Sequence, residues 1–329
     1  MLTLSPNASA ESTRPANSVR PKDGRPAYRP YRVAIAAIVP LSPHFIRVTF
    51  TGDDLENFGT DGHDQRIKIV IPFDDGHTSD IGASDATTIL DGTWYARWRE
   101  LPEDRRNPFR TYTIRAVRPE RAEVDVDLVA HGDGGPASRW LGRARVGDEL
   151  VVVGPDARSI ESCIGIDWHP GEATELLLAG DETAAPAICS ILESLPAGRR
   201  ARAFIEIPDA ADRLPVRLAP GAELAWLPRN GAPTGSLLEP AVRGWVAGHA
   251  SAIHDAIAAS AQEVDEIDVD SELLWDSPLE PAGAGFYAWL AGEAGVIKAL
   301  RRFLVSETGI DRKSVAFMGY WRLGRAEAQ

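Results

Sequence analysis

Short segments in which apolar and polar residues alternate dominate the chain between residues 31 and 155. Alternation with a period of two places successive side chains on opposite faces and predicts β-strands. Six segments share this pattern: Arg32–Ile38, Phe45–Thr51, Ile67–Ile71, Phe109–Val117, Glu123–Val129 and Glu149–Val153. The first two, and the fourth and fifth, flank proline-containing turns, which predicts two hairpins. Six short strands with little helix between them favour a small antiparallel β-barrel.

The pattern changes after residue 155, where short apolar strands alternate with helices. Strands are expected at Glu175–Ala179, Arg202–Ile207, Glu223–Trp226, Phe286–Ala291 and Ser314–Tyr320. Helices are expected at Ala184–Leu195, Leu237–Val246 and Gly295–Glu307. This alternation predicts a mostly parallel sheet covered on both faces. The fold class is therefore β + α/β, an N-terminal antiparallel six-stranded β-barrel followed by a C-terminal α/β domain.

These patterns divide the chain into a flexible N-terminal tail (residues 1–30), a barrel domain (31–155) and an α/β domain (156–329). The tail is rich in Pro, Ser, Ala and Arg and has almost no periodic apolar signal. Two acidic segments interrupt the pattern. Residues 74–93 are expected to form an exposed loop between barrel strands, and residues 251–281 an extension of the second domain.

Composition narrows the functional classes. The 329 residues are 44% hydrophobic and carry a net charge of -13, so the overall field repels nucleic acid and anionic lipid. No apolar run approaches the ~20 residues that a membrane-spanning helix needs. Cys163 and Cys189 are expected to be buried thiols, and no His or Cys spacing indicates a metal site. Since Met1–Thr13 lacks a secretory pattern, a cytoplasmic location is expected. The protein is also expected to be a monomer.

The first candidate chemical motif is Arg110-Thr111-Tyr112-Thr113, on a predicted barrel strand. Alternation puts Arg110 and Tyr112 on one face and the two threonines on the other. An aromatic ring beside a guanidinium suits a planar ligand that carries phosphate, because the ring can stack and the guanidinium can hold the anion. A half-buried edge strand with a solvated arginine explains the same four residues equally well.

The second motif runs from His131 to Trp140 and follows a predicted strand. It reads His-Gly-Asp-Gly-Gly-Pro-Ala-Ser-Arg-Trp, and its glycines let backbone N–H groups approach a ligand closely. Pro136 predicts the first turn of a helix, whose start near Ala137 and Ser138 offers N–H donors to a phosphate. The alternative is a strand-to-helix connection whose glycines only form a tight turn.

Together and in this order, the two motifs resemble the siderophore-interacting protein family, FAD-dependent ferric-siderophore reductases of the ferredoxin–NADP reductase superfamily. The similarity extends from about Tyr31 to Arg325. It implies an FAD-binding barrel in which Tyr112 packs on the flavin ring, Arg110 meets the pyrophosphate and Thr113 lies near the reactive N5 edge. Tyr112 and Thr113 are thus the implied catalytic residues. The other implied FAD-binding residues are Thr111, His131, Gly135, Pro136, Ala137, Ser138 and Trp140.

A third motif, Gly180-Asp181-Glu182-Thr183, lies where a buried strand ends and a helix begins, with Thr183 as a candidate N-cap. The resemblance implies that Asp181, Thr183 and Ala184 receive NADH or NADPH here. Acidic side chains replace the glycines of the usual dinucleotide fingerprint and could repel phosphate. An ordinary crossover in an α/β sheet is the alternative.

Two positions near the end of the chain complete the implied site. Glu293 follows a strand in an Ala-Gly-Glu turn, and the resemblance places it beside the nicotinamide and the flavin. Tyr320 or Trp321, in the terminal aromatic–basic segment, would cover the flavin or the nicotinamide. The alternative is that both segments only complete the packing of the last strand.

A ferric siderophore carries anionic oxygens around its iron, so its pocket should be locally basic despite the acidic total. Arg66 and Lys68, on one face of a predicted strand, and Arg139 are the residues expected to bind it. Lys68 is favoured because Gln65–Pro72 resembles the strand of the family that holds a siderophore-contacting lysine. Solvated surface cations are the alternative reading. No protein ligand to the iron is expected, since the siderophore fills the coordination sphere.

The resemblance implies that NADH or NADPH reduces FAD and that the flavin passes single electrons to ferric siderophore, which releases Fe(II) for iron assimilation. Two alternatives remain open. One is a flavin reductase that exchanges electrons with a ferredoxin-like protein. The acidic turn at Asp181 and Glu182 is consistent with this alternative. The other is a siderophore-binding protein without catalytic activity.

Overall fold

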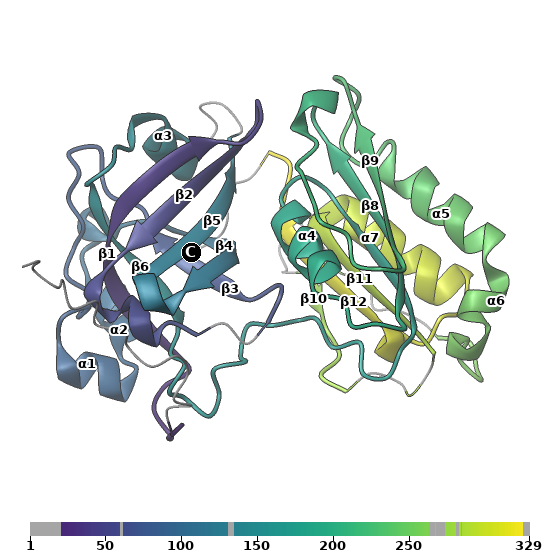
Figure 1. Cartoon of the computed structure of the whole chain (residues 1–329), viewed down its shortest axis with the longest axis horizontal. Helices are drawn as coiled ribbons and strands as arrows, with labels where there is room; N and C mark the ends of the chain where they lie inside the picture. Colours follow the sequence, from purple (N-terminus) through teal and green to yellow (C-terminus); the bar gives the residue numbers. More distant parts are fainter. Residues whose placement is uncertain are drawn as a thin grey trace, which may run out of the picture.

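The computed structural model describes residues 21–59, 62–130, 135–262, 267, 274–280, 283 and 285–324. Two lobes lie side by side (Figure 1). The first is a closed barrel with strand order β1-β2-β5-β4-β3-β6, all neighbours antiparallel. Its strands are β1 (Tyr28–Pro40), β2 (Phe45–Thr51), β3 (Arg66–Val70), β4 (Phe109–Arg118), β5 (Glu123–Val129) and β6 (Glu149–Pro155). The predicted six-stranded barrel is confirmed.

The second lobe contains a six-stranded sheet with the order β10-β12-β11-β7-β8-β9. Its strands are β7 (Glu175–Gly180), β8 (Arg200–Ile207), β9 (Ala222–Pro228), β10 (Trp275–Asp276), β11 (Phe286–Glu293) and β12 (Val315–Trp321). All neighbours are parallel except β10 and β12. The mostly parallel sheet is therefore confirmed, and β10 is an additional edge strand in the acidic segment 251–281, where none was predicted.

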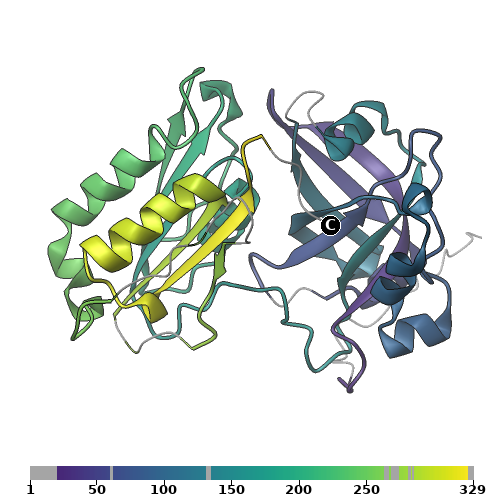
Figure 2. The ribbon, with the colours of Figure 1, turned by 180° about the vertical axis from the view of Figure 1, so that it is seen from behind.

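Helices cover both faces of this sheet. The main ones are α4 (Ala185–Glu193), α5 (Leu238–Gly248), α6 (Ala250–Ile253) and α7 (Ala294–Arg301), and α3 (Pro136–Arg143) belongs to the barrel. Figures 1 and 2 show α4 on the side of the sheet that faces the barrel, and α5 and α7 on the far side. Short helical turns are η1 (Asp53–Asn57), η2 (Glu103–Arg105), η3 (Pro119–Arg121), η4 (Ala210–Asp212), η5 (His254–Ala256), the π-helical η6 (Arg302–Glu307) and η7 (Arg312–Ser314).

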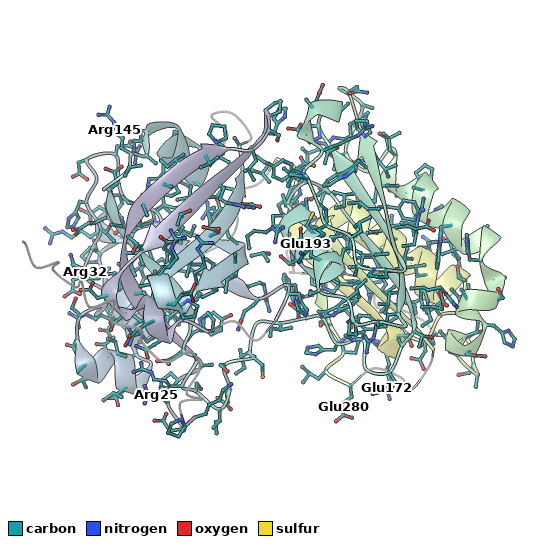
Figure 3. All side chains as sticks on the ribbon, viewed as in Figure 1. Arg25, Arg32, Arg145, Glu172, Glu193 and Glu280 are labelled. Atoms are coloured by element: carbon teal, nitrogen blue, oxygen red, sulfur yellow. The ribbon has the colours of Figure 1, made fainter. Side chains whose placement is uncertain are left out.

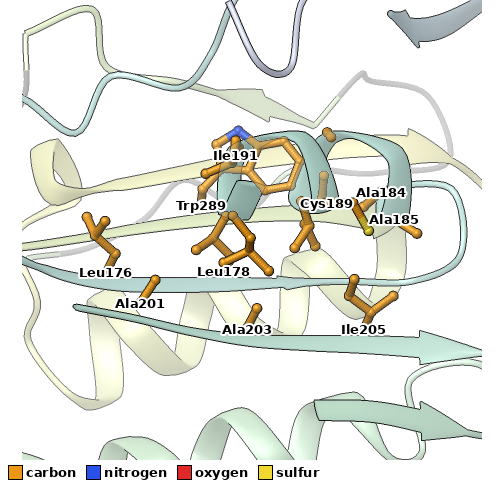
Figure 4. Close-up of a cluster of buried hydrophobic side chains, with 14 of the residues drawn as sticks. Leu176, Leu178, Ala184, Ala185, Cys189, Ile191, Ala201, Ala203, Ile205 and Trp289 are labelled. Atoms are coloured by element: carbon orange, nitrogen blue, oxygen red, sulfur yellow. The ribbon is translucent and has the colours of Figure 1, made fainter. Parts of the chain in front are cut away.

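Strand β7 shows why these segments are apolar throughout. Leu176 and Leu178 pack toward α4, whereas Leu177 and Ala179 belong to the cluster under α5 and α7, so both faces of the strand are buried. Figure 4 shows the α4 side of this core, with Trp289 of β11 over β7. Burying one leucine side chain fully contributes about 1.5–3 kcal/mol. The carboxyl ends of the strands are thus held on a rigid support.

The acidic segment 74–93 is not one exposed loop, because it contains helix α1 (Ala86–Asp91) and leads directly into α2 (Trp94–Glu100). The Asp85 carboxylate accepts a hydrogen bond from the backbone N–H of Thr88 and caps α1, and Gly92 ends it with a φ of 68°. Helix α2 buries Trp98 against Phe109 of the barrel. Helix α2 therefore covers part of the outer face of the barrel.

The structure also bears on the start of the barrel, the two cysteines and the lengths of the helices. The boundary predicted at Tyr31 lies inside β1, and Asp23 already forms a bridge with Ser159. Cys189 is buried as predicted, and burial raises the pKa of its thiol to about 12, but Cys163 is exposed. Within the described ranges, no helix combines the length and apolarity needed to cross a bilayer.

Candidate functional site

Strand β4 runs along the junction of the two lobes and is fixed there by Arg115. The guanidinium donates to Glu193 at 2.8 Å and to the Ser190 hydroxyl at 3.4 Å, both on α4. It also lies 3.6 Å from Asp127 of β5. Figure 3 shows Glu193 on the side of the second lobe that faces the barrel. Helix α4 is therefore held against β4 by a charged contact.

A second contact joins the lobes at Asp212. Its carboxylate accepts hydrogen bonds from the Ser42 hydroxyl at 2.8 Å and from the backbone N–H of His44 at 2.9 Å, and it lies 2.7 Å from Nδ1 of His44. Burial alone would raise the pKa of Asp212, but these hydrogen bonds lower it. The turn between β1 and β2 is thus tied to the segment after β8.

On one face of β4, Arg110 and Tyr112 are both half-buried. The Tyr112 ring packs against the edge of the barrel core, and Arg110 Nη1 donates to the Phe109 carbonyl at 2.7 Å. An aromatic ring and a guanidinium therefore occupy the same face of one strand, as alternation predicts.

On the other face of β4, the two threonines meet different neighbours. The Thr111 hydroxyl accepts a hydrogen bond from Lys68 Nζ at 3.2 Å. Thr113 is 5% exposed and lies near the Tyr320 hydroxyl of β12, which has no hydrogen-bond partner among the described residues. Thr113 therefore lies at the contact between the barrel and the sheet.

Helix α3 starts without a side-chain cap. Its N-cap is Gly135, followed by Pro136 at the first helical position. At the other end, Arg143 donates to the carbonyls of Pro72 and Phe73, just after β3. This contact places α3 at the end of the barrel where β3 ends and β4, its antiparallel neighbour, begins. The uncapped N-terminus and the Arg110 side of β4 thus belong to one end of the barrel.

The remaining residues of the second motif divide into three groups. Ala137 and Ser138 are half-buried at the start of α3. Trp140 is 2% exposed and lies in the barrel core, so its side chain has a packing role there. His131 lies outside the described residues.

The turn after β7 is closed by the side chain of Asp181. This carboxylate accepts hydrogen bonds from the backbone N–H and the hydroxyl of Thr183, at 2.9 and 2.6 Å. It also accepts from the backbone N–H of Glu293 and from Trp321 Nε1, both at 2.7 Å. The predicted N-cap role of Thr183 is wrong, because α4 has Ala184 at its N-cap and Thr183 donates to Asp181 instead.

Two glycines allow the strand ends to meet at this turn. A Cβ on Gly180 would come within 2.5 Å of the Ala291 carbonyl oxygen, and one on Gly292 within 2.7 Å of the Asp181 carboxylate. Gly292 also has a φ of 151°. The sheet order reverses between β7 and β11, so the turn lies at the switch point where open α/β sheets bind ligands.

A cavity of about 440 Å³ opens beside this turn. Its lining comes from the carboxyl ends of β8, β9 and β11, from the segment after β9 and from Leu323 after β12. The lining residues are Pro208, Arg229, Gly231, Ala232, Pro233, Thr234, Glu293 and Leu323. Of the nucleotide-site residues predicted from the sequence, Glu293 lies in the wall of this cavity.

The three predicted siderophore-binding cations occupy different surroundings. Arg66 forms an ion pair with Asp167 at 3.1 Å and lies over the Trp275 ring at 4.2 Å. Lys68 lies over the Phe109 ring at 4.8 Å. Arg139 is exposed on α3. Arg66 and Lys68 share one face of β3, but Arg66 is partly neutralised by the second lobe.

Sequence reasoning missed a pair of acids under the junction, Asp64 and Asp167. Asp64 accepts from Trp289 Nε1 and from the backbone N–H of Asp167, both at 3.0 Å, and Trp275 Nε1 donates to Asp167 at 3.1 Å. Burial, and then the charge of Asp167, raise the pKa of Asp64 to about 7. Asp64 stands immediately before β3, but no local pattern predicts partners over 100 residues away.

Comparison with known proteins identifies the family. A model of the siderophore-interacting FAD-binding domain matches residues 34–159, and a model of the siderophore-interacting protein matches residues 173–324. The uncharacterized protein Rv2895c of Mycobacterium tuberculosis is 31% identical over 307 residues, 92% of this chain and 93% of its own. The chain belongs to the siderophore-interacting protein family.

Two further members and a related fold extend this finding. The ferric vibriobactin reductase ViuB of Vibrio cholerae is 27% identical over 290 residues, 87% of each chain. The crystal structure of the siderophore-interacting protein SipS from Aeromonas hydrophila superposes with a TM-score of 0.61 at 26% identity, covering 92% of this chain and 94% of that one. The ferredoxin–NADP⁺ reductase of Plasmodium falciparum shares the fold, with a TM-score of 0.53 at 9% identity over 87% and 94% of the two chains.

The residues present fit the FAD that this family's first domain binds. The match to the FAD-binding domain spans β4 and α3. Those elements supply a half-buried aromatic ring, a guanidinium on the same strand face and a helix start with no side-chain cap. Such a donor set suits a planar ring joined to a pyrophosphate, because helix N-termini and arginine both favour phosphate oxygens. The assignment of individual residues to the cofactor stays a prediction.

Proposed function

We propose that this protein is an FAD-dependent ferric-siderophore reductase that uses NADH or NADPH and releases Fe(II) for iron assimilation. The observation that carries the proposal is the arrangement of side chains on β4. It presents Tyr112 and Arg110 on one face and brings Thr113 of the other face against Tyr320 of the second lobe. Similarity to ViuB, which is named a ferric vibriobactin reductase, supports the same activity.

FAD, when bound, supplies the redox chemistry, since it accepts two electrons from a nicotinamide and passes them on singly. Tyr112 would pack on the ring system, and Arg110 and the start of α3 would hold the pyrophosphate. Thr113 would lie at one edge of the ring, on the side of Tyr320. The ring contacts of Tyr320 with Trp275 and Trp289 would shield this end of the junction from water.

The proposed substrate is an anionic ferric siderophore. Lys68, Arg66 and Arg139 attract its oxygens, and the siderophore itself completes the coordination of the iron. One NAD(P)H gives up two electrons, two Fe(III) centres take one each, and one proton is released. Because siderophores bind Fe(III) more tightly than Fe(II), the reduction also frees the metal.

Anaerobic absorbance spectroscopy tests this proposal. The purified protein, reconstituted with FAD if needed, should be yellow, should bleach with NADH or NADPH and should recover its colour when a ferric siderophore is added. A Tyr112→Ala variant should retain less FAD, whereas Tyr95→Ala, which removes an exposed ring on α2, should retain as much as the wild type. A colourless protein that takes up no FAD would refute the proposal.

A further inference from the structure

The cavity beside the β7–α4 turn holds an arginine that is already paired. Arg229 is the one cationic residue among the described residues that line it. Its guanidinium donates to the two oxygens of Glu182 at 2.6 and 2.9 Å, and lies 3.5 Å from Glu206. The Arg229 side chain is 11% exposed and that of Glu182 1%. Bidentate geometry and burial make this a strong pair that a second anion would have to displace.

Glu206 cannot readily leave this cluster, because it also holds the start of α5. Its carboxylate accepts hydrogen bonds from the backbone N–H groups of Gly235, Leu237 and Leu238, at 2.7, 2.9 and 3.1 Å. The residue is fully buried. A second negative charge is therefore fixed beside Arg229.

Glu293 adds a third carboxylate, and among the described residues it is the acidic one that lines the cavity itself. It accepts hydrogen bonds from the backbone N–H of Val296 at 2.9 Å and from that of Leu323 at 3.2 Å. Two carboxylates at the Arg229 guanidinium and a third in the same cavity wall leave this region net negative. A phosphate dianion placed here would be repelled, whereas a neutral hydroxyl would not.

The cavity lies where an open α/β sheet binds the ribose of a nucleotide, so its negative charge affects which nucleotide can bind. In open α/β sheets, the pyrophosphate lies at the first strand-to-helix turn, and the ribose lies over the end of the next strand. Here these places are the β7–α4 turn and the end of β8, where Pro208 lines the cavity. An arginine available at the ribose favours a 2′-phosphate, whereas an acidic group favours a free 2′-hydroxyl.

We infer that this cavity takes an adenosine ribose with a free 2′-hydroxyl, so that the electron donor is NADH rather than NADPH. The inference rests on the proposed function for the presence of a nicotinamide donor. It goes further by assigning the choice of donor to Arg229 and the carboxylates of Glu182, Glu206 and Glu293.

Fragment binding tests the inference without turnover. Isothermal titration of the FAD-loaded protein with 5′-AMP and with 2′,5′-ADP should show 2′,5′-ADP binding at least about tenfold more weakly. Equal or tighter binding of 2′,5′-ADP would overturn the inference, and so would the failure of both fragments to bind.

A variant with one negative charge fewer tests whether the carboxylates cause the preference for 5′-AMP. Glu182→Gln removes one negative charge while retaining a hydrogen-bond acceptor for Arg229, so the preference for 5′-AMP should fall by about tenfold, which corresponds to about 1.4 kcal/mol. Glu223→Gln, on the exposed face of β9, should leave the preference unchanged. An unchanged preference in folded Glu182→Gln would overturn the assignment to this cluster. If that variant does not fold, the wild-type comparison still decides the choice of ligand.

Failure of the inference and failure of the proposed function are distinguishable. A protein that prefers 5′-AMP but reduces no ferric siderophore refutes the function and leaves the inference standing. A protein that reduces ferric siderophore with equal kcat/KM for NADH and NADPH, and binds both fragments equally, refutes the inference alone.

Discussion

The two sides of the junction are built in opposite ways. On the barrel side, Arg110 and Tyr112 are half-buried, and α3 starts without a side-chain cap. On the sheet side, Asp181 and Glu182 are each 1% exposed, and both carboxylates are engaged by donors of the chain itself. The barrel side thus presents a half-buried ring, a guanidinium and a helix start without a side-chain cap, whereas the sheet side is closed by internal hydrogen bonds beside an open cavity.

This difference suits two ligands with different residence times. The proposed FAD, which stays bound, would contact the half-buried ring and the helix start without a side-chain cap. A nucleotide that binds and leaves at each turnover needs a site that keeps its shape when empty, and buried hydrogen bonds provide that rigidity. Substitutions should therefore reduce cofactor affinity on the barrel side and stability on the sheet side.

The largest effect is expected for Asp181→Ala. The substitution leaves four hydrogen-bond donors without their acceptor in a buried turn, and each such loss costs about 1–3 kcal/mol. The free energy of unfolding should fall by about 3 kcal/mol or more in chemical denaturation. The matched control is Asp85→Ala, which removes one exposed helix cap and should cost about 1 kcal/mol. Equal losses in the two variants would show that the sheet side is not the rigid one.

Tyr112→Ala should act on the cofactor rather than on the fold. Loss of a stacked ring should weaken FAD binding by about tenfold or more, equivalent to about 1.4 kcal/mol. The unfolding free energy of the cofactor-free protein should change by less than about 1 kcal/mol, because the ring is only half-buried. Fluorescence titration of the cofactor-free protein with FAD measures the first quantity. An unchanged FAD affinity would remove Tyr112 from the site.

Asp64 makes the junction sensitive to pH. Its pKa is raised from 3.8 to about 7 in the fold, so the folded state binds the proton more tightly than the unfolded state. The stabilisation is full below about pH 4 and is lost as the pH rises to about 7. Between these values the wild type should lose up to about 1.4 kcal/mol of unfolding free energy per pH unit relative to Asp64→Asn. Parallel pH profiles for the two proteins would contradict this.

Lys68→Ala should have the smallest effect. A partly exposed lysine that attracts an anion contributes up to about 1 kcal/mol, so the KM for an anionic ferric siderophore should rise by about fivefold with kcat unchanged. Lys313→Ala, which removes an exposed lysine of η7, is the control and should leave KM unchanged. Steady-state assays at low and high salt check this, and an equal effect of both variants would exclude a specific role for Lys68.

The order of strands and helices followed from local patterns, because alternation and amphipathicity report which faces are buried. The prediction of an exposed loop for residues 74–93 was wrong. Its small and acidic residues are typical of loops, but Asp85 and Gly92 were the cap and stop signals of α1. The prediction for Thr183 failed because α4 starts one residue later, with Ala184 at the N-cap, and Thr183 is bound to Asp181 in the turn before the helix.

The parts of the site that local patterns could not predict depend on residues far apart in sequence. Asp64 and Trp289 are 225 positions apart, and Glu182 and Arg229 are 47 apart. From the sequence, the acidic turn indicates repulsion of phosphate. In the structure both acids are engaged internally, and their effect on a ligand depends on the charge of the whole cluster.

The most direct test of the central claim is the stoichiometry of iron release. The FAD-loaded protein is mixed anaerobically with a ferric siderophore and a limiting amount of NADH, and Fe(II) is trapped with a ferrous-specific dye. A ferric-siderophore reductase yields two Fe(II) for each NADH oxidised, and omission of FAD abolishes the yield. Binding of the siderophore with no Fe(II) formed would contradict the account and leave a carrier in its place.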